Sequence, residues 1–263
     1  MIRRPAPIVA IAATVVFTLI LAACSPTSSA PVLTDPTAIV MAALTSAESA
    51  KSVHLELTAN GTASVPLPIV GSSGTPIDLT GTTASADVDL AKSAAKVTFA
   101  VPTMLGLAGE LIAVDGKLYV KTTLTGAQYQ QSDLGGAAPS PSQAPGMIDN
   151  LGDVLLKQGI VLVKGDDVAC GSKQCYTVTA DLDPSKIAPT ASGSIAGVPI
   201  DLSGATVKLT VHVEKDLPNH LAGLTAEIAT PSAGTVKIEL TFSKWDEPVS
   251  IAAPPADQIK SGS

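Results

Sequence analysis

Alternation of apolar and polar residues at every second position most constrains what this chain can fold into. It is clearest from residue 52 onward, where every second residue is apolar: Val53, Leu55, Leu57 and Ala59. This period predicts a half-buried strand. Further strands are predicted at 82–90, 96–101, 111–114, 118–121, 160–164, 175–182, 206–215, 224–230 and 235–242. Asp115-Gly116 is a two-residue hairpin signal, and the chain can also turn at or just after Asn60-Gly61.

Two segments show the helical period instead. Residues 37–51 follow Asp35-Pro36, a helix N-cap with proline at the first helical position. Residues 147–158 carry a second apolar helical face and end at Gly159. The predicted fold class is therefore α+β, a curved antiparallel sheet with helices on its concave face. Aromatic residues are only 3% of the chain, so the space beneath the helices is either a core of small side chains or a hydrophobic cavity.

An internal echo suggests that the domain, residues 35–253, is built of two similar halves. The segment 74–81 (GTPIDLTG) resembles 197–204 (GVPIDLSG), and each precedes an alternating strand. Chance recurrence in a chain rich in alanine, threonine and glycine is the alternative. Residues 254–263 are polar and are predicted to form a loose tail.

The beginning of the chain predicts export. Arg3 and Arg4 precede an apolar run from Ile8 to Leu21, which is short for a membrane span. Leu-Ala-Ala directly before Cys24 is typical of a lipobox, in which the cysteine receives a lipid and becomes the first residue after cleavage. We therefore expect a signal peptide at 1–23, lipid attachment at Cys24 and a flexible Ser/Pro-rich tether at 24–34. A plain signal peptide or a single membrane anchor is the alternative.

The charge of the processed chain excludes nucleic acid as a partner. Both arginines leave with residues 1–23, so that 14 lysines face 23 acidic residues and the net charge is −9. Such a chain offers no basic patch for a phosphate backbone. Attachment to a membrane surface must depend on the lipid anchor.

The two remaining cysteines, Cys170 and Cys175, are predicted to form a disulfide. They are an even pair in an extracytoplasmic chain, separated by four residues that include a glycine. A redox dithiol is the alternative, but it favours Cys-x-x-Cys at the start of a helix.

Catalytic motifs do not assemble in this sequence. There is no Gly-x-Ser-x-Gly segment, and the Ser-x-x-Lys match at Ser93 and Lys96 falls at a predicted turn. His54 and His212 lie on outward faces of predicted strands, a poor arrangement for a zinc site. We expect neither an enzyme nor a metal or cofactor.

Several segments together resemble the mycobacterial lipoprotein family LppX/LprA/LprF/LprG. They are the lipobox with its tether, residues 50–54 (AKSVH), residues 114–121 (VDGKLYVK) and residues 242–249 (FSKWDEPV). The resemblance covers essentially the whole processed chain, and the short cysteine pair and the length are most similar to the LprF branch.

The resemblance implies a half-barrel that encloses a hydrophobic cavity, binds acylated lipids or glycolipids and carries them across the envelope. The implied location is the extracytoplasmic side of the cell membrane, with an envelope transporter as a possible partner. A different possibility is an accessory or sensor lipoprotein that binds another envelope protein and no lipid. The residues expected to line the cavity are Ile39, Val40, Leu44, Leu55, Leu57, Val97, Phe99, Leu151, Leu155, Leu209, Val211, Ile238 and Leu240.

Overall fold

The fold is taken from a computed structural model, which describes residues 32–64, 76–133, 152, 155–156, 160–183, 194–195, 198–199, 204–231 and 234–260. Its helices include α1 (Pro36–Ser49) and the short 3-10 helix η3 (Ala256–Gln258). The strands of the first half are β1 (Ser52–Ser64), β2 (Pro76–Asp78), β3 (Thr82–Asp89), β4 (Ala94–Val101), β5 (Leu107–Val114), β6 (Lys117–Thr122) and β7 (Gln130–Asp133). Those of the second half are β8 (Leu162–Lys164), β9 (Val168–Cys170), β10 (Lys173–Leu182), β11 (Ser194–Ile195), β12 (Val198–Pro199), β13 (Thr206–Glu214), β14 (Leu221–Thr230) and β15 (Gly234–Ser243).

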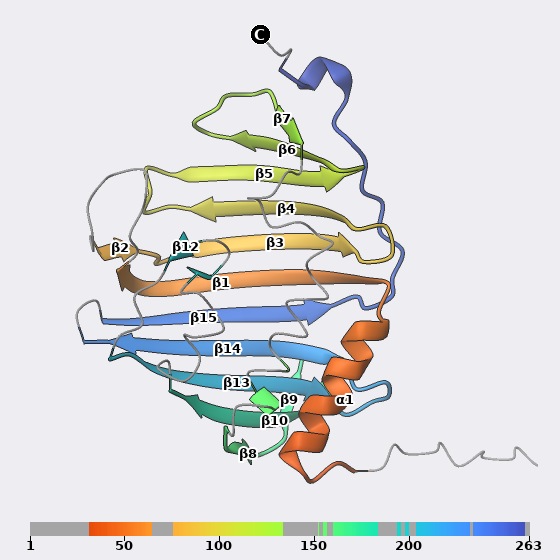
Figure 1. The fold of residues 1–263 in the computed structure, drawn as a ribbon, viewed down its shortest axis with the longest axis vertical. Helices are drawn as coiled ribbons and strands as arrows, with labels where there is room; N and C mark the ends of the chain where they lie inside the picture. The colour runs from red at the N-terminus through yellow and green to blue at the C-terminus, as the bar shows by residue number, and fades with distance from the viewer. Residues whose placement is uncertain are drawn as a thin grey trace, which may run out of the picture. The chain divides into compact units, whose positions relative to one another are not determined.

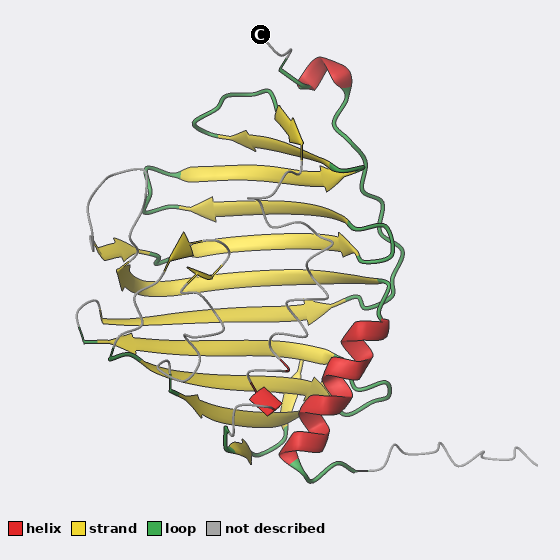
Figure 2. Ribbon diagram, viewed as in Figure 1, coloured by secondary structure: helices red, strands yellow, loops and turns green. Residues whose placement is uncertain are grey.

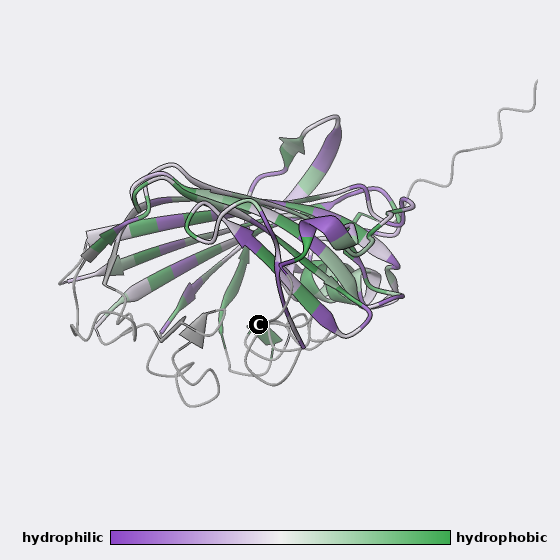
Figure 3. Cartoon of the chain, turned by 90° about the horizontal axis from the view of Figure 1, so that it is seen from above, coloured by the Kyte–Doolittle hydropathy of each residue, from purple (hydrophilic) through white to green (hydrophobic). Residues whose placement is uncertain are grey.

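Most of these strands form one antiparallel sheet, in the order β7-β6-β5-β4-β3-β1-β15-β14-β13-β10-β8, with β2 and β9 paired at its margins (Figure 1). The strands of each half stay together, and β1 pairs with β15 to join them. The predicted strands are present, within a few residues at their ends. The sheet curves, and α1 lies on its concave side (Figure 3), so the predicted fold class is confirmed.

Side chains of opposite character occupy the two faces of the sheet. One row of paired residues crosses five strands as Phe99, Ala84, Leu57, Leu240 and Leu224. We call the face that carries this row, and against which α1 packs, the inner face. The next row, on the opposite face, reads Thr98, Ser85, Glu56, Thr241 and Gly223. In these five strands the period of two read from the sequence therefore separates an apolar inner face from a polar outer face. Near β5 and β6 the outer face also carries apolar side chains, Ile112 and Tyr119, which belong to a buried cluster.

The helix α1 covers one end of the inner face (Figure 2). Asp35 caps it, because its Oδ1 accepts a hydrogen bond from the Thr37 backbone N–H at 3.0 Å. Its buried side chains include Ile39, Val40 and Ala43, which pack against β10 and β13. We call this packed group the α1 core; its buried members are Ile39, Val40, Ala43, Leu155, Tyr176, Val178, Ala180, Leu209, Val211, Val213 and Leu221.

The predicted second helix at 147–158 lies almost wholly outside the described residues. Of that segment, Gly152, Leu155 and Leu156 are described, and they have helical backbone. Leu155 is buried in the α1 core.

The segment after β15 is held in place, contrary to the loose tail expected from residue 254. The Tyr129 backbone N–H donates to the Gln258 carbonyl at 2.8 Å, and the Lys260 N–H donates to the Tyr129 carbonyl at 2.8 Å. Ile251 and Ile259 pack against a second apolar cluster that contains Ile112, Tyr119 and Tyr129. Residues 251–260 thus fasten the β5–β7 end of the sheet, which sequence polarity alone did not indicate.

Asn60-Gly61 does not turn the chain, because β1 continues through it to Ser64. Gly61 has φ +111°, and a Cβ atom there would lie 2.0 Å from the Thr235 carbonyl oxygen on β15. The glycine therefore allows β1 and β15 to lie close together and does not form a hairpin turn.

The proposed two-half repeat has a local counterpart in the fold. Gly81 (φ +75°) precedes β3 and faces Pro102, which follows β4; Gly204 (φ +70°) lies just before β13 and faces Pro231, which follows β14. The duplication itself stays a prediction.

Candidate functional site

The inner face of the sheet carries apolar side chains well beyond the strands that α1 contacts. The residues on it, which we call the open inner face, are half-buried and come from six strands: Leu55, Leu57, Ala84, Ala86, Val97, Phe99, Leu111, Val120, Ile238 and Leu240. The helix α1 packs against β8, β10, β13 and β14, at the other end of the sheet. An unbroken apolar surface therefore continues past the α1 core.

The predicted lining residues fall into two groups. Leu55, Leu57, Val97, Phe99, Ile238 and Leu240 belong to the open inner face, as their registers show. The other group forms or touches the α1 core: Ile39, Val40, Leu44, Leu155, Leu209 and Val211. Leu151 lies outside the described residues. The second group is closely packed, with Ile39 0% and Val211 4% exposed, so it supports the face rather than offering free surface.

Phe99 is the one large aromatic side chain of the open inner face. It pairs with Gly109 on β5, and a Cβ atom at Gly109 would lie 2.7 Å from the Phe99 ring. The missing side chain lets the ring lie over the neighbouring strand. Gly109 thereby determines how far Phe99 projects from the face, a role that sequence reasoning missed.

The outer face carries the ionisable groups. The His54 imidazole Nδ1 lies 2.7 Å from Asp87 Oδ1. Glu110 accepts a hydrogen bond from the Tyr129 hydroxyl at 2.6 Å and pairs with Lys96 at 3.3 Å. Partial burial opposes ionisation of Glu110, but the hydrogen bonds from Tyr129 and Lys96 hold its pKa below the usual value. These groups are paired with one another and serve the stability of the outer face.

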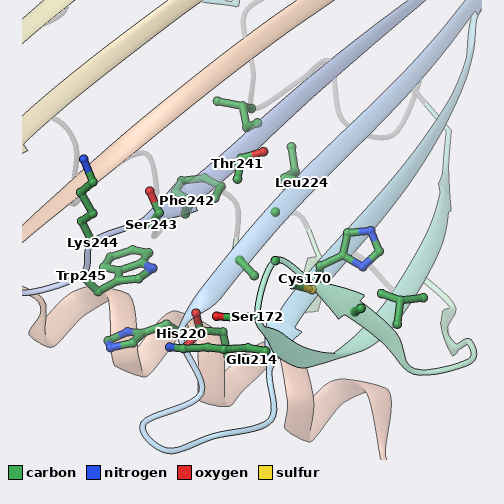
Figure 4. A pocket seen from close by; sticks show the side chains of 18 of the residues that line it. Cys170, Ser172, Glu214, His220, Leu224, Thr241, Phe242, Ser243, Lys244 and Trp245 are labelled. Atoms are coloured by element: carbon green, nitrogen blue, oxygen red, sulfur yellow. The ribbon is translucent and has the colours of Figure 1, made fainter.

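A hollow of about 740 Å³ opens between the disulfide hairpin and the ends of β13, β14 and β15 (Figure 4). The Cys170–Cys175 disulfide is formed, as predicted, and Lys173 pairs with Glu214 at 2.5 Å beside it. At the other wall His220 stacks on Trp245, with ring centroids 5.0 Å apart.

The histidines of this hollow are held by structural contacts. His220 Nδ1 lies 2.7 Å from the Ser46 hydroxyl on α1, and Trp245 Nε1 donates to the Leu221 carbonyl at 2.9 Å. Burial lowers the pKa of His220, and likewise that of His212. No group of three His, Cys, Asp or Glu side chains suited to a metal occurs in the part of the chain that the structure describes. The hollow thus brings together groups that join α1 to the sheet.

The protein thus belongs to the class of α+β proteins in which a helix covers one end of a single antiparallel sheet. Similarity to known proteins then identifies the family. The family model of the LppX_LprAFG lipoproteins matches residues 35–251, and the chain belongs to this family.

Solved structures show the same fold. Lipoprotein LppX from Mycobacterium tuberculosis is 21% identical with a TM-score of 0.51, over 82% of this chain and 98% of that one. LprF from Mycobacterium bovis is 18% identical with a TM-score of 0.55, over 83% and 96%. These values do not distinguish which member is most similar, so the expected LprF likeness stays a prediction. No protein of curated function matches the sequence. Among the described residues, no helix is long and apolar enough to cross a membrane.

Proposed function

We propose that this protein is a membrane-anchored extracytoplasmic lipoprotein that binds the acyl chains of lipids or glycolipids and carries them across the cell envelope. The observation that carries the proposal is the open inner face, an apolar surface that spans six strands beyond the α1 core. The role is binding and transfer, without catalysis.

The physical chemistry of an acyl chain suits this surface. Each methylene group removed from water contributes about 0.8 kcal/mol, so a long chain needs contact area rather than many hydrogen bonds. The open inner face supplies that area with Leu57, Val97 and Phe99, and polar side chains are directed to the outer face by the strand period. Specificity for a headgroup would require polar residues at the rim.

The α1 core provides the rigid support for such a site. Its buried side chains attach α1 to β10 and β13 and close that end of the inner face. Bound acyl chains would then lie alongside α1 and over the half-buried residues of β1, β3, β4 and β5.

Location follows from the lipobox and from the family. Acylation of Cys24 would hold the protein at the outer side of the cell membrane, and two or three acyl chains make such an attachment stable. The tether at 24–34 would leave the domain free to reorient over the membrane, and an envelope transporter is a possible partner for loading.

The test compares two substitutions on neighbouring residues of β4. Val97 lies on the open inner face and Thr98 on the exposed outer face, and both are β-branched, so Val97→Asn and Thr98→Asn cost similar strand propensity. An amide without partners in an apolar contact costs about 1–3 kcal/mol, so Val97→Asn should lower lipid retention about tenfold. Thr98→Asn should retain lipid as wild type does.

The assay is mass spectrometry of organic extracts from full-length protein purified in mild detergent from a mycobacterial host. Acyl chains bound covalently at Cys24 stay with the polypeptide in this extraction. Equal lipid content in both variants would show that the open inner face is not the binding site. A wild-type protein without extractable lipid would instead favour an accessory or sensor lipoprotein that binds another envelope protein.

A further inference from the structure

Two turns at one end of the strands expose large apolar side chains. The β4–β5 turn contains Met104 and Leu105, which are 37% and 97% exposed, and the β6–β7 turn contains Leu124, which is 74% exposed. Both turns lie at the same end of the sheet (Figure 1). We call this end of the sheet, with the exposed side chains of Met104, Leu105 and Leu124, the leucine end.

Hydrogen bonds anchor each of the two turns to a neighbouring strand. The Thr123 backbone N–H donates to the Ala108 carbonyl at 2.8 Å, and the Ala108 N–H donates to the Thr123 hydroxyl at 3.3 Å. The Thr103 hydroxyl donates to the Asp78 carbonyl, which ties the β4–β5 turn to β2. The exposed leucines are thus presented by anchored loops.

Neither burial nor backbone conformation explains why a leucine occupies position 105. Its φ is +54°, in the left-handed region where glycine or asparagine fits with less strain. A leucine that is both strained and almost fully exposed stabilises nothing within the described fold. Its side chain is therefore available to something outside it.

Charge distinguishes this end of the sheet from the other. The turns at 79–81, 102–106 and 123–128 contain no ionisable residue. Turns at the opposite end carry charges, among them Lys92, Asp115, Lys215 and Asp216. The turns that carry Met104, Leu105 and Leu124 therefore bring no charge of their own to a partner, and the nearest carboxylate is that of Asp78, exposed at the end of β2 beside the β4–β5 turn.

The leucine end also continues the open inner face. Val101 at the end of β4 pairs with Leu107 at the start of β5, on the same face as Phe99 and directly beside the turn. An acyl chain leaving the inner face in this direction would pass between the apolar turns.

We propose that the leucine end docks on the surface of a lipid bilayer, with Leu105, Leu124 and Met104 inserted among neutral lipids. The inner face then opens toward the membrane where lipid enters or leaves, a role that rests on the proposed carrier function. A bilayer fits better than a protein partner because separate apolar tips insert without a complementary shape.

The test is depth-dependent fluorescence quenching on full-length protein reconstituted into phosphatidylcholine vesicles. Leu105→Cys and Leu124→Cys each carry an environment-sensitive dye, and Asp115→Cys places the same dye at the opposite end. Vesicles that contain nitroxide-labelled lipid should quench the dyes at 105 and 124 and leave that at 115 unquenched. Equal quenching at 105 and 115 would overturn the proposal and direct attention to a protein partner.

A second substitution tests whether the leucines drive docking. Removing one inserted leucine should lower the docking equilibrium about tenfold, measured as the loss of quenching at 105 on changing Leu124→Asn. Leu217→Asn, at a leucine 66% exposed on the opposite end, is the matched control and should change nothing. Unchanged quenching with Leu124→Asn would contradict insertion. Because the dyes report docking whether or not lipid is bound, failure here is separable from failure of the carrier function.

Discussion

The stability of the seam, by which we mean the pairing of β1 with β15 that joins the two halves of the sheet, should depend on Gly61. Gly61 on β1 pairs with Val236 on β15, and an alanine Cβ at this position would lie 2.0 Å from the Thr235 carbonyl oxygen. Real Cβ contacts essentially never fall below 3.0 Å, so Gly61→Ala must separate the strands by about 1 Å.

The cost of Gly61→Ala has two parts. A φ of +111° costs an L-residue about 1–2 kcal/mol. Loss of about two ladder hydrogen bonds beside Val236 costs about 1–3 kcal/mol more. The expected loss in the free energy of unfolding is therefore about 2–5 kcal/mol. Gly116→Ala is the control, because Gly116 also has positive φ but a Cβ added there would meet no atom within 4 Å, so only the conformational cost of about 1 kcal/mol remains.

The assay is urea unfolding followed by the fluorescence of Trp245, the single tryptophan of the chain. Trp245 stacks on His220 and Phe242, so its environment reports the packing at the end of β15. If Gly61→Ala and Gly116→Ala lower the free energy of unfolding equally, the close approach of β1 and β15 does not control the stability of the seam.

Two further predictions concern pH and the anchor. Burial lowers the pKa of His220 in the fold below the ordinary 6.5, so the unfolded chain binds more protons and the free energy of unfolding should fall as the pH drops below about 6.5. His220→Gln should reduce this pH dependence, measured as the difference between urea midpoints at about pH 7.5 and 5.5. The same difference in the variant and in wild type would refute the prediction. Cys24→Ala should abolish acylation and move the protein to the aqueous phase of a detergent partition, whereas wild type stays in the detergent phase. Intact mass is the readout, and a variant that still carries the mass of acyl chains would contradict attachment at Cys24.

Much of the local structure could be read from the sequence because it depends on neighbouring residues. The period of two located β1, β3, β4 and β13 to within a few residues, and Asp35-Pro36 located the start of α1. The same period assigned Leu57 and Val97 to one face, where the structure places them. Of the two positions expected for a turn, Asn60-Gly61 itself does not turn the chain, because a hairpin signal cannot reveal that another strand passes within contact of the glycine. The chain does reverse after it, since β2 pairs antiparallel with the end of β1.

Contacts between distant segments left no comparable signal. The polar composition of residues 254–260 predicted a loose tail, yet Tyr129 binds this segment through two backbone hydrogen bonds. Backbone groups form such bonds whatever the side chain, so composition does not reveal them. The exposed leucines at 105 and 124 lie in separate turns, and only the pairing of β5 with β6 brings them together.

The sequence by itself determined the strands, the helix α1, the division of each strand into an apolar and a polar side, and the spacing of the cysteine pair. These features follow from the backbone geometry of a few consecutive residues. The tertiary structure alone decided that β1 joins β15, that α1 covers one end of the inner face, and that the rest of that face continues to the leucine end. Strand order depends on which of many long-range pairings buries the most apolar surface, a comparison of whole folds that no local pattern contains.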